Sequence, residues 1–155
     1  MDCRYEEYMI AALSEAKKTA QSQDVPIGAV IVKNGEIIAT GHNEREAHGD
    51  STAHAEIQAI RSACERLGGW HLDSCELYVT LEPCPMCMGA IVNSRIKRVV
   101  FGAKDSKAGA CGSVFNFNDY PLNHKPEIVS GVMEEEGRAL LSEFFTKKRE
   151  EKKNK

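Results

Sequence analysis

Residues 76–103 read ELYVTLEPCPMCMGAIVNSRIKRVVFGA, and this stretch decides the expected architecture. Its two ends, residues 76–81 and 98–103, are rich in β-branched and aromatic side chains, which is typical of strands. The middle, residues 83–94, has the composition of a helix, with Pro85 near the first turn. Two strands joined through a helix are expected to lie parallel in one sheet. The stretch therefore predicts an α/β fold.

The preceding part of the chain predicts a helix and a hairpin. Residues 5–21 carry apolar side chains at helical spacing. Residues 27–33 and 36–41 are β-rich and are joined by Asn34-Gly35, a strong two-residue hairpin turn. We therefore expect one antiparallel strand pair in the sheet.

The remaining segments supply two more helices and a short strand. Ser51 and Thr52 are predicted to cap a helix over residues 53–67, which Gly68-Gly69 ends. Two further elements are a strand at 128–129 and a closing helix over 133–150, whereas 43–50 and 104–126 are expected to be loops.

This order of elements predicts a three-layer α/β/α sandwich with a central mixed sheet. Residues 1–150 are expected to form a single domain, followed by a basic, disordered tail at 151–155.

The composition narrows the class of protein. The chain has 155 residues, of which 42% are hydrophobic and 28% charged, with a net charge of −3. This apolar content excludes a disordered chain, and no apolar run approaches the roughly 20 residues that span a bilayer. The first residues lack the features of a signal peptide, so we expect a cytoplasmic protein with reduced thiols and no membrane partner.

Positive charge is concentrated in two places on this acidic chain. Residues 95–107 hold five basic side chains and one acidic side chain, and residues 147–155 hold six basic and two acidic side chains. Such stretches are suited to a polyanion.

A metal motif is split between two predicted helix starts. His54-Ala55-Glu56 opens one helix, and Pro83-Cys84-Pro85-Met86-Cys87 opens another. One imidazole and two thiolates are ligands that Zn²⁺ prefers. Cys84 and Cys87 share a helix face, and a helix N-terminus favours thiolates. Three protein ligands leave the fourth position for water, as in catalytic zinc sites.

The spacing of His54 and Glu56 constrains where a metal can lie. Residues two apart point to roughly opposite sides of a helix, so both can serve one site only at the helix tip. We therefore expect the metal between two helix N-termini, with Glu56 beside it as a proton carrier rather than a ligand.

Other interpretations of the motif remain open. The C-x-x-C pair could be redox-active or a packing feature. A closed structural zinc site would need a fourth ligand. The candidates for that ligand are Cys111, His42, His48, Cys64 and Cys75.

Several segments resemble the zinc-dependent cytidine/deoxycytidylate deaminase superfamily and, within it, the bacterial tRNA-specific adenosine deaminases. The H-x-E and P-C-x-x-C motifs are the signature of the superfamily. The segments that select the tRNA enzymes lie at 24–30, 52–56, 77–84, 94–103, 123–124 and 140–145. The resemblance covers about residues 5–150.

The resemblance implies a cytidine-deaminase-like sandwich, a homodimer and one zinc ion per subunit on His54, Cys84 and Cys87. It implies hydrolytic conversion of the wobble adenosine in the anticodon of an arginine tRNA to inosine, with release of ammonia. Glu56 would carry protons, and Asn43 would bind the target base. The backbone around Ala55 and Pro83 would line the same pocket.

RNA binding is expected at two places. Aromatic rings beside basic side chains at the end of the last helix suit single-stranded RNA, and the resemblance implies that this helix end and the loop at 104–107 contact it. One of the two adjacent phenylalanines is also expected to pack into the core. The expected RNA-binding residues are Lys104, Asp105, Lys107, Phe144, Phe145, Lys148 and Arg149.

Two other functions compete with tRNA deamination. A free-base or nucleotide deaminase for guanine or cytosine compounds can share both metal motifs, although residues 95–103 and the aromatic-basic final helix favour the tRNA enzyme. A non-catalytic, zinc-stabilised RNA-binding module would need four protein ligands.

Overall fold

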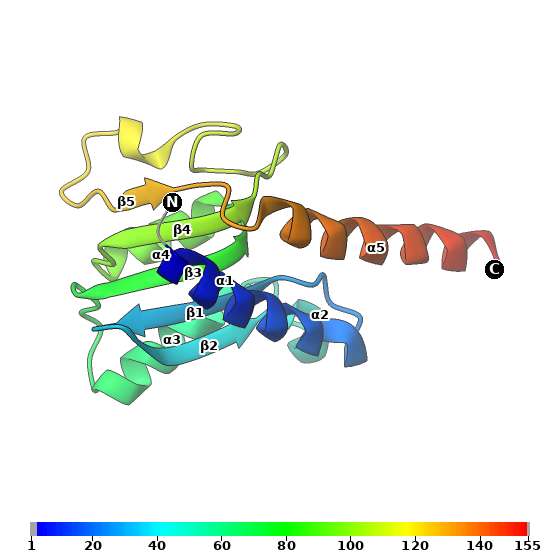
Figure 1. Cartoon of the computed structure of the whole chain (residues 1–155), viewed down its shortest axis with the longest axis horizontal. Helices are drawn as coiled ribbons and strands as arrows, with labels where there is room; N and C mark the ends of the chain where they lie inside the picture. The colour runs from blue at the N-terminus through cyan, green and yellow to red at the C-terminus, as the bar shows by residue number, and fades with distance from the viewer. Residues whose placement is uncertain (1–2, 155) are drawn as a thin grey trace.

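The predicted strands assemble into a five-stranded mixed sheet in the order β2-β1-β3-β4-β5 (Figure 1). The computed structural model describes residues 3–154. The strand bounds are β1 Gly28–Lys33, β2 Glu36–His42, β3 Cys75–Leu81, β4 Arg98–Ala103 and β5 Glu127–Val129. Asn34 and Gly35 between β1 and β2 have φ of 53° and 77°, as a type I′ hairpin turn requires. The predicted hairpin is confirmed.

The strand directions bring the carboxyl ends of β2, β3 and β4 to one edge. β1 is antiparallel to both β2 and β3, whereas β3, β4 and β5 are mutually parallel. β2, β3 and β4 therefore run in the same direction, and their carboxyl ends lie at the same edge. In α/β sheets this is the edge where ligands bind.

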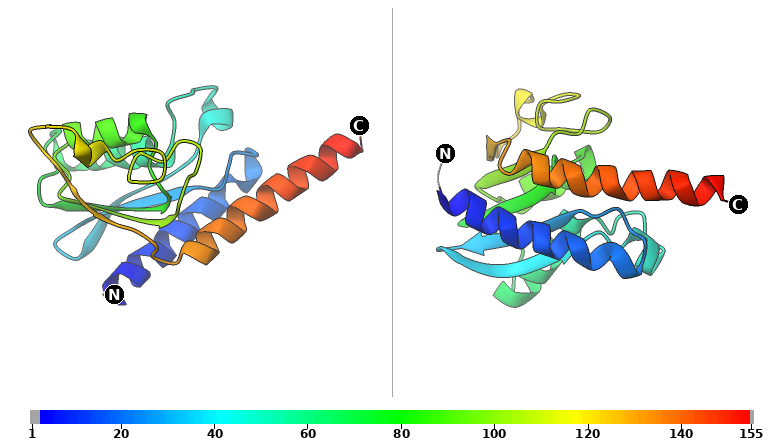
Figure 2. Two further views of the ribbon diagram at one scale, coloured as in Figure 1. Left: turned by 90° about the horizontal axis from the view of Figure 1, so that it is seen from above. Right: turned by 45° about the vertical axis from the view of Figure 1, so that its right-hand side comes forward.

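Helices cover both faces of the sheet, which confirms the three-layer sandwich (Figure 2). The helix α1 (Cys3–Ala16) and part of α5 (Glu134–Lys153) cover one face, and α3 (Ala55–Leu67) and α4 (Pro85–Asn93) cover the other. Successive side chains of β1 point to opposite faces of the sheet, so both faces need a helical cover. Val30 and Val32 pack with α1, and Ala29 and Ile31 pack with α3.

Three local predictions differ from the structure. The first helix ends as a 3₁₀ turn, Lys17–Gln21, and a 3₁₀ turn at Phe117–Asp119 interrupts the long loop before β5. The segment expected as loop at 43–50 contains a single helical turn, α2 (Arg45–His48). The carboxylate of Asp24 accepts hydrogen bonds from the N–H groups of the residues at 46 and 47, at 2.7 and 3.2 Å. A cap so distant in sequence leaves no local signal.

The prediction that Ser51 and Thr52 cap the third helix is wrong. That helix begins at Ala55, and its N-cap residue is His54. The N–H and hydroxyl of Thr52 instead donate to the carboxylate of Asp50, at 2.8 and 2.7 Å. Short polar side chains form such local turns in competition with helix capping.

The last helix extends beyond the sheet (Figures 1 and 2). It continues to Lys153, three residues into the segment expected as a tail, and Gly137 is its only buried residue.

Strand β4 divides the basic stretch at 95–107 into two parts. The six residues of this strand separate the two ends of the stretch by about 20 Å. Within residues 3–154, no helix is both long and apolar enough to cross a bilayer.

The loop after β4 is organised by a buried carboxylate, Glu82, which is 2% exposed. Glu82 accepts hydrogen bonds from the N–H groups of Asp105, Cys111 and Ser113 at 3.1, 2.9 and 3.2 Å, and from the hydroxyl of Ser113. Burial alone would raise the pKa of Glu82, but these four donors outweigh it and lower the pKa below its usual value.

We predict that Glu82→Gln destabilises the fold by about 1–3 kcal/mol at neutral pH, because an amide accepts fewer of these bonds. A lowered carboxyl pKa stabilises the fold fully above the unfolded value of 4.5, and this stabilisation is lost as pH falls through the folded value. The difference from wild type should therefore shrink in acid. Urea unfolding at pH 7 and at progressively lower pH measures it.

The matched control is Glu36→Gln, because Glu36 is a highly exposed glutamate in the hairpin. This change should alter stability little at any pH. A Glu82→Gln penalty that stays constant down to acid pH would contradict the role of a charged Glu82.

Candidate metal centre and active site

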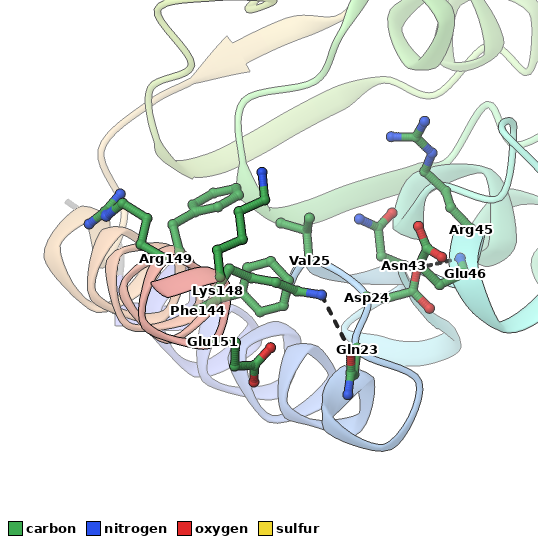
Figure 3. A pocket seen from close by; sticks show the side chains of 12 residues that line it. Gln23, Asp24, Val25, Asn43, Arg45, Glu46, Phe144, Lys148, Arg149 and Glu151 are labelled. Atoms are coloured by element: carbon green, nitrogen blue, oxygen red, sulfur yellow. Dashed lines mark hydrogen bonds between the residues drawn. The ribbon is translucent and has the colours of Figure 1, made fainter. Parts of the chain in front are cut away.

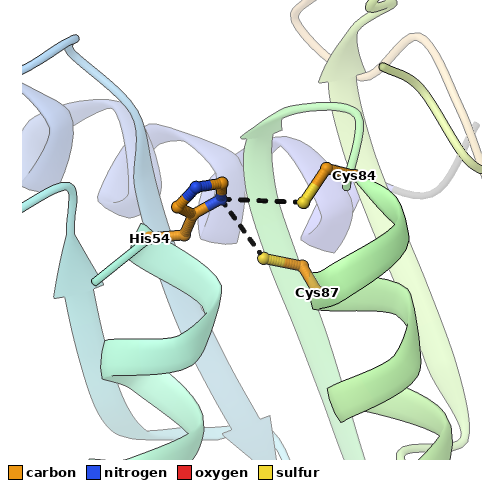
Figure 4. A group of neighbouring side chains, drawn as sticks. All are labelled: His54, Cys84 and Cys87. Atoms are coloured by element: carbon orange, nitrogen blue, oxygen red, sulfur yellow. Dashed lines mark hydrogen bonds between the residues drawn. The ribbon is translucent and has the colours of Figure 1, made fainter. Parts of the chain in front are cut away.

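The two metal motifs meet because of the strand directions. His54 is the N-cap of α3, which follows β2, and Cys84 is the N-cap of α4, which follows β3. Both helices start from the same edge of the sheet and run back across the same face. Figure 4 shows His54 facing Cys84 and Cys87 across the gap between the two helix N-termini.

The three donor atoms have the spacing of a tetrahedral zinc site. His54 Nδ1 lies 3.7 Å from Cys84 Sγ and 3.5 Å from Cys87 Sγ, and all three atoms lie within 4.8 Å of one another. Zinc bond lengths at a tetrahedral angle require about 3.6 Å between a nitrogen and a sulfur ligand. These residues therefore fit zinc, in both donor chemistry and spacing.

The cysteine pair already carries negative charge. The Cys87 thiol donates to Cys84 and His54 lies beside it, which together lower the pKa of Cys84 to about 4 despite its burial. The same shared proton, together with burial, raises the pKa of Cys87, and Cys84 raises the pKa of His54. A thiolate, the form that binds metal, is thus stabilised at the N-terminus of α4.

No fourth His, Cys, Asp or Glu joins this group within residues 3–154. The Cys111 thiol donates to the Met88 sulfur at 3.4 Å. His42 and His48 contact glutamates at 3.1 and 2.6 Å. Cys75 is part of the apolar core, and Cys64 packs against that core. The described part of the chain therefore leaves the group with three ligands, as a catalytic site needs.

Glu56 lies next to the cluster without belonging to it. It is the second residue of α3, is 4% exposed, and reaches the Cys87 thiol with its carboxyl group. Burial raises the pKa of Glu56 to about 7. A carboxyl group with such a pKa can take up and release a proton near neutral pH.

Ala55 and Pro83 flank the cluster, as expected from their neighbours in sequence. Ala55 is fully buried at the start of α3. Pro83 is buried directly before Cys84, and its carbonyl accepts from the N–H of Ala110 at 2.9 Å. The loop after β4 is thereby fastened to the start of α4.

Asn43 follows β2 at the same edge and has an unusual environment. It is 4% exposed, and its N–H donates to the carbonyl of Ile27 at 3.1 Å. Its side-chain oxygen Oδ1 is buried with no hydrogen-bond partner among the described residues. Buried polar atoms are normally paired, so an unpaired acceptor here indicates a place for a ligand.

Asn43 opens into a pocket of about 620 Å³ between the body of the protein and α5 (Figure 3). Asn43 and the side chains of α5 lie on opposite walls of this pocket. Four of the residues predicted to bind RNA line it, namely Phe144, Phe145, Lys148 and Arg149.

The expectation that one of these phenylalanines packs into the core is wrong. Phe144 is half-buried and Phe145 is 45% exposed, and their rings meet edge to face at 5.2 Å. The Lys148 ammonium lies 5.6 Å from the centre of the Phe144 ring. The helix projects beyond the sheet, so no core is available to these rings.

The second group of predicted RNA-binding residues lies in the loop after β4. Lys104 and Lys107 are exposed. The carboxylate of Asp105 accepts from the N–H groups of Lys107 and Ala108, at 3.0 and 3.1 Å. Asp105 therefore shapes its own loop.

Sequence reasoning missed two buried acids, Asp24 and Glu82, that build this edge. Both lie in segments that carry the family resemblance, but only the fold shows which N–H groups donate hydrogen bonds to them. It also missed Arg45 of α2, which lines the pocket. No local pattern identifies it.

Comparisons with known proteins agree with this geometry. The family profile of MafB19-like deaminases matches residues 4–149. The tRNA-specific adenosine deaminase of Bacillus subtilis is 54% identical, over 94% of this chain and 91% of that protein. The enzyme of the same name from Aquifex aeolicus is 52% identical, over 93% and 95%.

Solved structures of deaminases superpose on this chain as well. A structure from work on A-to-I editing by tRNA:A34 deaminases superposes with a TM-score of 0.84 and 46% identity, over 87% of this chain and 99% of that one. A guanine deaminase from Nitrosomonas europaea superposes with a TM-score of 0.75 and 27% identity, over 90% and 83%. By its sequence, its fold and its three-donor cluster, the chain belongs to the MafB19-like deaminases and, within them, to the family of tRNA-specific adenosine deaminases.

Proposed function

We propose that this chain catalyses the hydrolytic deamination of the wobble adenosine in a tRNA anticodon to inosine, with release of ammonia. The observation that carries the proposal is the three-donor cluster of His54, Cys84 and Cys87 with buried Glu56 beside it. One zinc ion per subunit, bound by those three residues, would make water a nucleophile near neutral pH.

Glu56 moves the protons of the reaction. The net change adds water at C6 of adenine and removes ammonia, so a proton must leave the attacking water and protons must reach the ring and the departing amine. Glu56 is the buried carboxyl group in contact with the cluster, so it is placed to carry out both transfers. Its burial limits competing exchange with bulk water.

Asn43 and the pocket beside it bind the nucleotide. The unpaired Oδ1 of Asn43 accepts a hydrogen bond from the target base, which relieves the cost of an unpaired buried acceptor. The backbone around Ala55 and Pro83, at the starts of the two helices, would border the bound base next to the cluster. An anticodon loop suits this arrangement, since its unstacked bases can turn outward into a pocket.

The projecting half of α5 supports a polymeric substrate over a free base. Phe144 and Phe145 offer stacking surfaces, and Lys148 and Arg149 offer charge for phosphates on the same wall of the pocket. Lys104 and Lys107 extend the positive charge at the same edge of the sheet. Asp105 supports that loop from within.

We further infer the oligomeric state, the tRNA and the cellular compartment from the resemblance and the names of the relatives. The chain acts as a homodimer, its substrate is an arginine tRNA, and it works in the cytoplasm. Met86, Val114 and Tyr120 are large apolar side chains exposed in the single subunit, and contact with a second subunit would reduce that exposure.

The decisive experiment compares RNA with free compounds. Zinc-loaded protein is incubated with an arginine tRNA transcript and, separately, with adenosine, guanine and cytidine. Mass spectrometry of the digested RNA should show inosine at the wobble position and no comparable turnover of the free compounds. Turnover of a free compound without inosine in the RNA would favour the free-base deaminase instead.

Replacing the proton carrier separates catalysis from metal binding. We expect Glu56→Ala to retain about one zinc per chain and to lose at least about 100-fold in deamination rate. Metal analysis and single-turnover assays measure the two properties. Glu36→Ala, in the exposed hairpin, is the control and should behave as wild type. Full activity of Glu56→Ala would support a non-catalytic role for this carboxyl group.

Replacing any one ligand should release the metal. His54→Ala, Cys84→Ala and Cys87→Ala each leave two donors, so zinc content after dialysis against a weak chelator should fall well below that of wild type. Unfolding should occur at lower temperature, since metal binding contributes folding free energy. Cys3→Ala changes an exposed cysteine and serves as control. Undiminished zinc in the ligand variants would refute the site.

The basic residues of α5 should contribute affinity rather than chemistry. Lys148→Ala and Arg149→Ala are each expected to weaken binding of an anticodon stem-loop and to reduce the salt dependence of log K by about one charge. The rate at saturating RNA should change little. Lys125→Ala, an exposed lysine before β5 at the opposite edge of the sheet, is the control. Unchanged affinity in both α5 variants would remove this helix from the RNA interface.

A further inference from the structure

The unpaired oxygen of Asn43 raises the question of what holds it in place. A buried acceptor without a partner gains free energy by turning toward water or toward another donor. The position of the amide depends on the backbone that carries it, which continues into His42 at the end of β2 and Glu44 directly after Asn43.

These two neighbours face away from Asn43. Successive side chains along a strand alternate between its faces. Asn43 lines the pocket beside α5, whereas His42 and Glu44 both line a separate pocket of about 370 Å³ on the other side. The two flanking side chains are therefore free to contact helices without obstructing the site.

His42 fastens the strand end to α1. Its Nδ1 lies 3.1 Å from Oε1 of Glu15, a carboxylate that is only 7% exposed. Lys18 also contacts Glu15, at 3.0 Å. Burial would raise the pKa of Glu15, but the hydrogen bonds from His42 and Lys18 lower it below the usual value. Glu15 is thus an ionised acceptor for the His42 ring.

Glu44, on the other side of Asn43, contacts α2 and α3. Its Oε1 accepts from the Gln58 side-chain amide at 3.2 Å, and its Oε2 lies 2.6 Å from His48 Nε2. Its N–H donates to the carbonyl of Ala53 at 2.9 Å. Gln58 is two residues beyond Glu56 on α3, so this contact ties the Asn43 backbone to the helix that carries the proton carrier.

Close backbone packing reinforces the same connection. Gly41 lies against the first turn of α3, where an added Cβ would come within 2.6 Å of the Ala59 nitrogen. The end of β2 therefore cannot move relative to α3 without breaking contacts on both sides of Asn43.

We propose that His42 and Glu44 are positioning residues that set the location of the Asn43 amide relative to Glu56, and thereby the fit of the target base. This inference rests on the proposed role of Asn43 in binding that base. His42 and Glu44 themselves touch no substrate atom.

A double-mutant cycle on zinc-loaded protein tests the proposal. His42→Phe keeps the ring and removes the bond to Glu15, and Glu44→Ala removes the bonds to Gln58 and His48. Each should lower kcat/KM for an anticodon stem-loop by about tenfold, through kcat as well as KM, at unchanged zinc content. His42→Gln, which can still donate to Glu15, should recover most of the loss. In an Asn43→Ala background, His42→Phe and Glu44→Ala should change kcat/KM by less than twofold.

The matched control is His71→Phe, because His71 forms an exposed histidine–aspartate pair with Asp73 in the loop after α3. It should leave kcat/KM unchanged in both backgrounds. If His42→Phe or Glu44→Ala lowers kcat/KM by the same factor with and without Asn43, the residue acts independently of Asn43 and the proposal is wrong. Wild-type kinetics in both variants would overturn it as well.

A second measurement does not depend on activity. The side-chain amide NMR signals of Asn43, assigned with Asn43→Ala, should shift or broaden in His42→Phe and Glu44→Ala and stay in place in His71→Phe. Unmoved signals would refute positioning even if the chain edits tRNA. Shifted signals in a protein that makes no inosine would retain the positioning role and refute the proposed function instead.

Discussion

Two helix N-termini that meet at one edge of the sheet are the constraint on which the candidate site depends. His54 and Cys84 are the N-cap residues of α3 and α4, and no side chain caps either helix. Free N–H groups and the helix dipole at each N-terminus favour negative charge, and this environment stabilises the thiolate of Cys84. The same geometry solves the problem posed by the H-x-E spacing, because side chains two residues apart can reach one point only at a helix tip. The geometry of the three-donor cluster thus follows from where the helices begin.

Buried carboxylates maintain that edge. Glu82 gathers the loop after β4, Asp24 caps α2, and Glu15 holds the end of β2 through His42. Each carboxylate is ionised and accepts hydrogen bonds from segments far away in sequence. Such groups are costly to bury unless every partner is present, so they tie the loops to one arrangement. The apolar core explains the stability of the sandwich, and these polar contacts explain the placement of the loops around the cluster.

The direction of α5 leaves one wall of the Asn43 pocket on a helix that projects beyond the sheet (Figure 1). Only Gly137 of the helix is buried, and its outer half leaves the sheet with two aromatic rings and several basic side chains exposed or half-buried. A small molecule would need few of these contacts, whereas a folded RNA can engage the pocket and the helix together. The likeness to a guanine deaminase at 27% identity shows that the sheet and the helices around it also occur in a protein named for a free base.

Local patterns along the chain are sufficient to predict the layers and the types of metal ligand. Strong β-rich and helical periodicities gave every major element, and Asn34-Gly35 gave the hairpin, because these signals are local. The types and spacing of His54, Glu56, Cys84 and Cys87 indicated a three-ligand metal site, since ligand preference belongs to the residue itself. Which groups meet depends on the assembled fold. The single turn of α2 and the position of the loop around Glu82 depend on partners more than twenty residues away in sequence. His42 and Glu44 reach Glu15 and Gln58, which are 27 and 14 residues away. Those contacts form only when the strands are paired in this order and direction, and no local sequence pattern specifies that pairing.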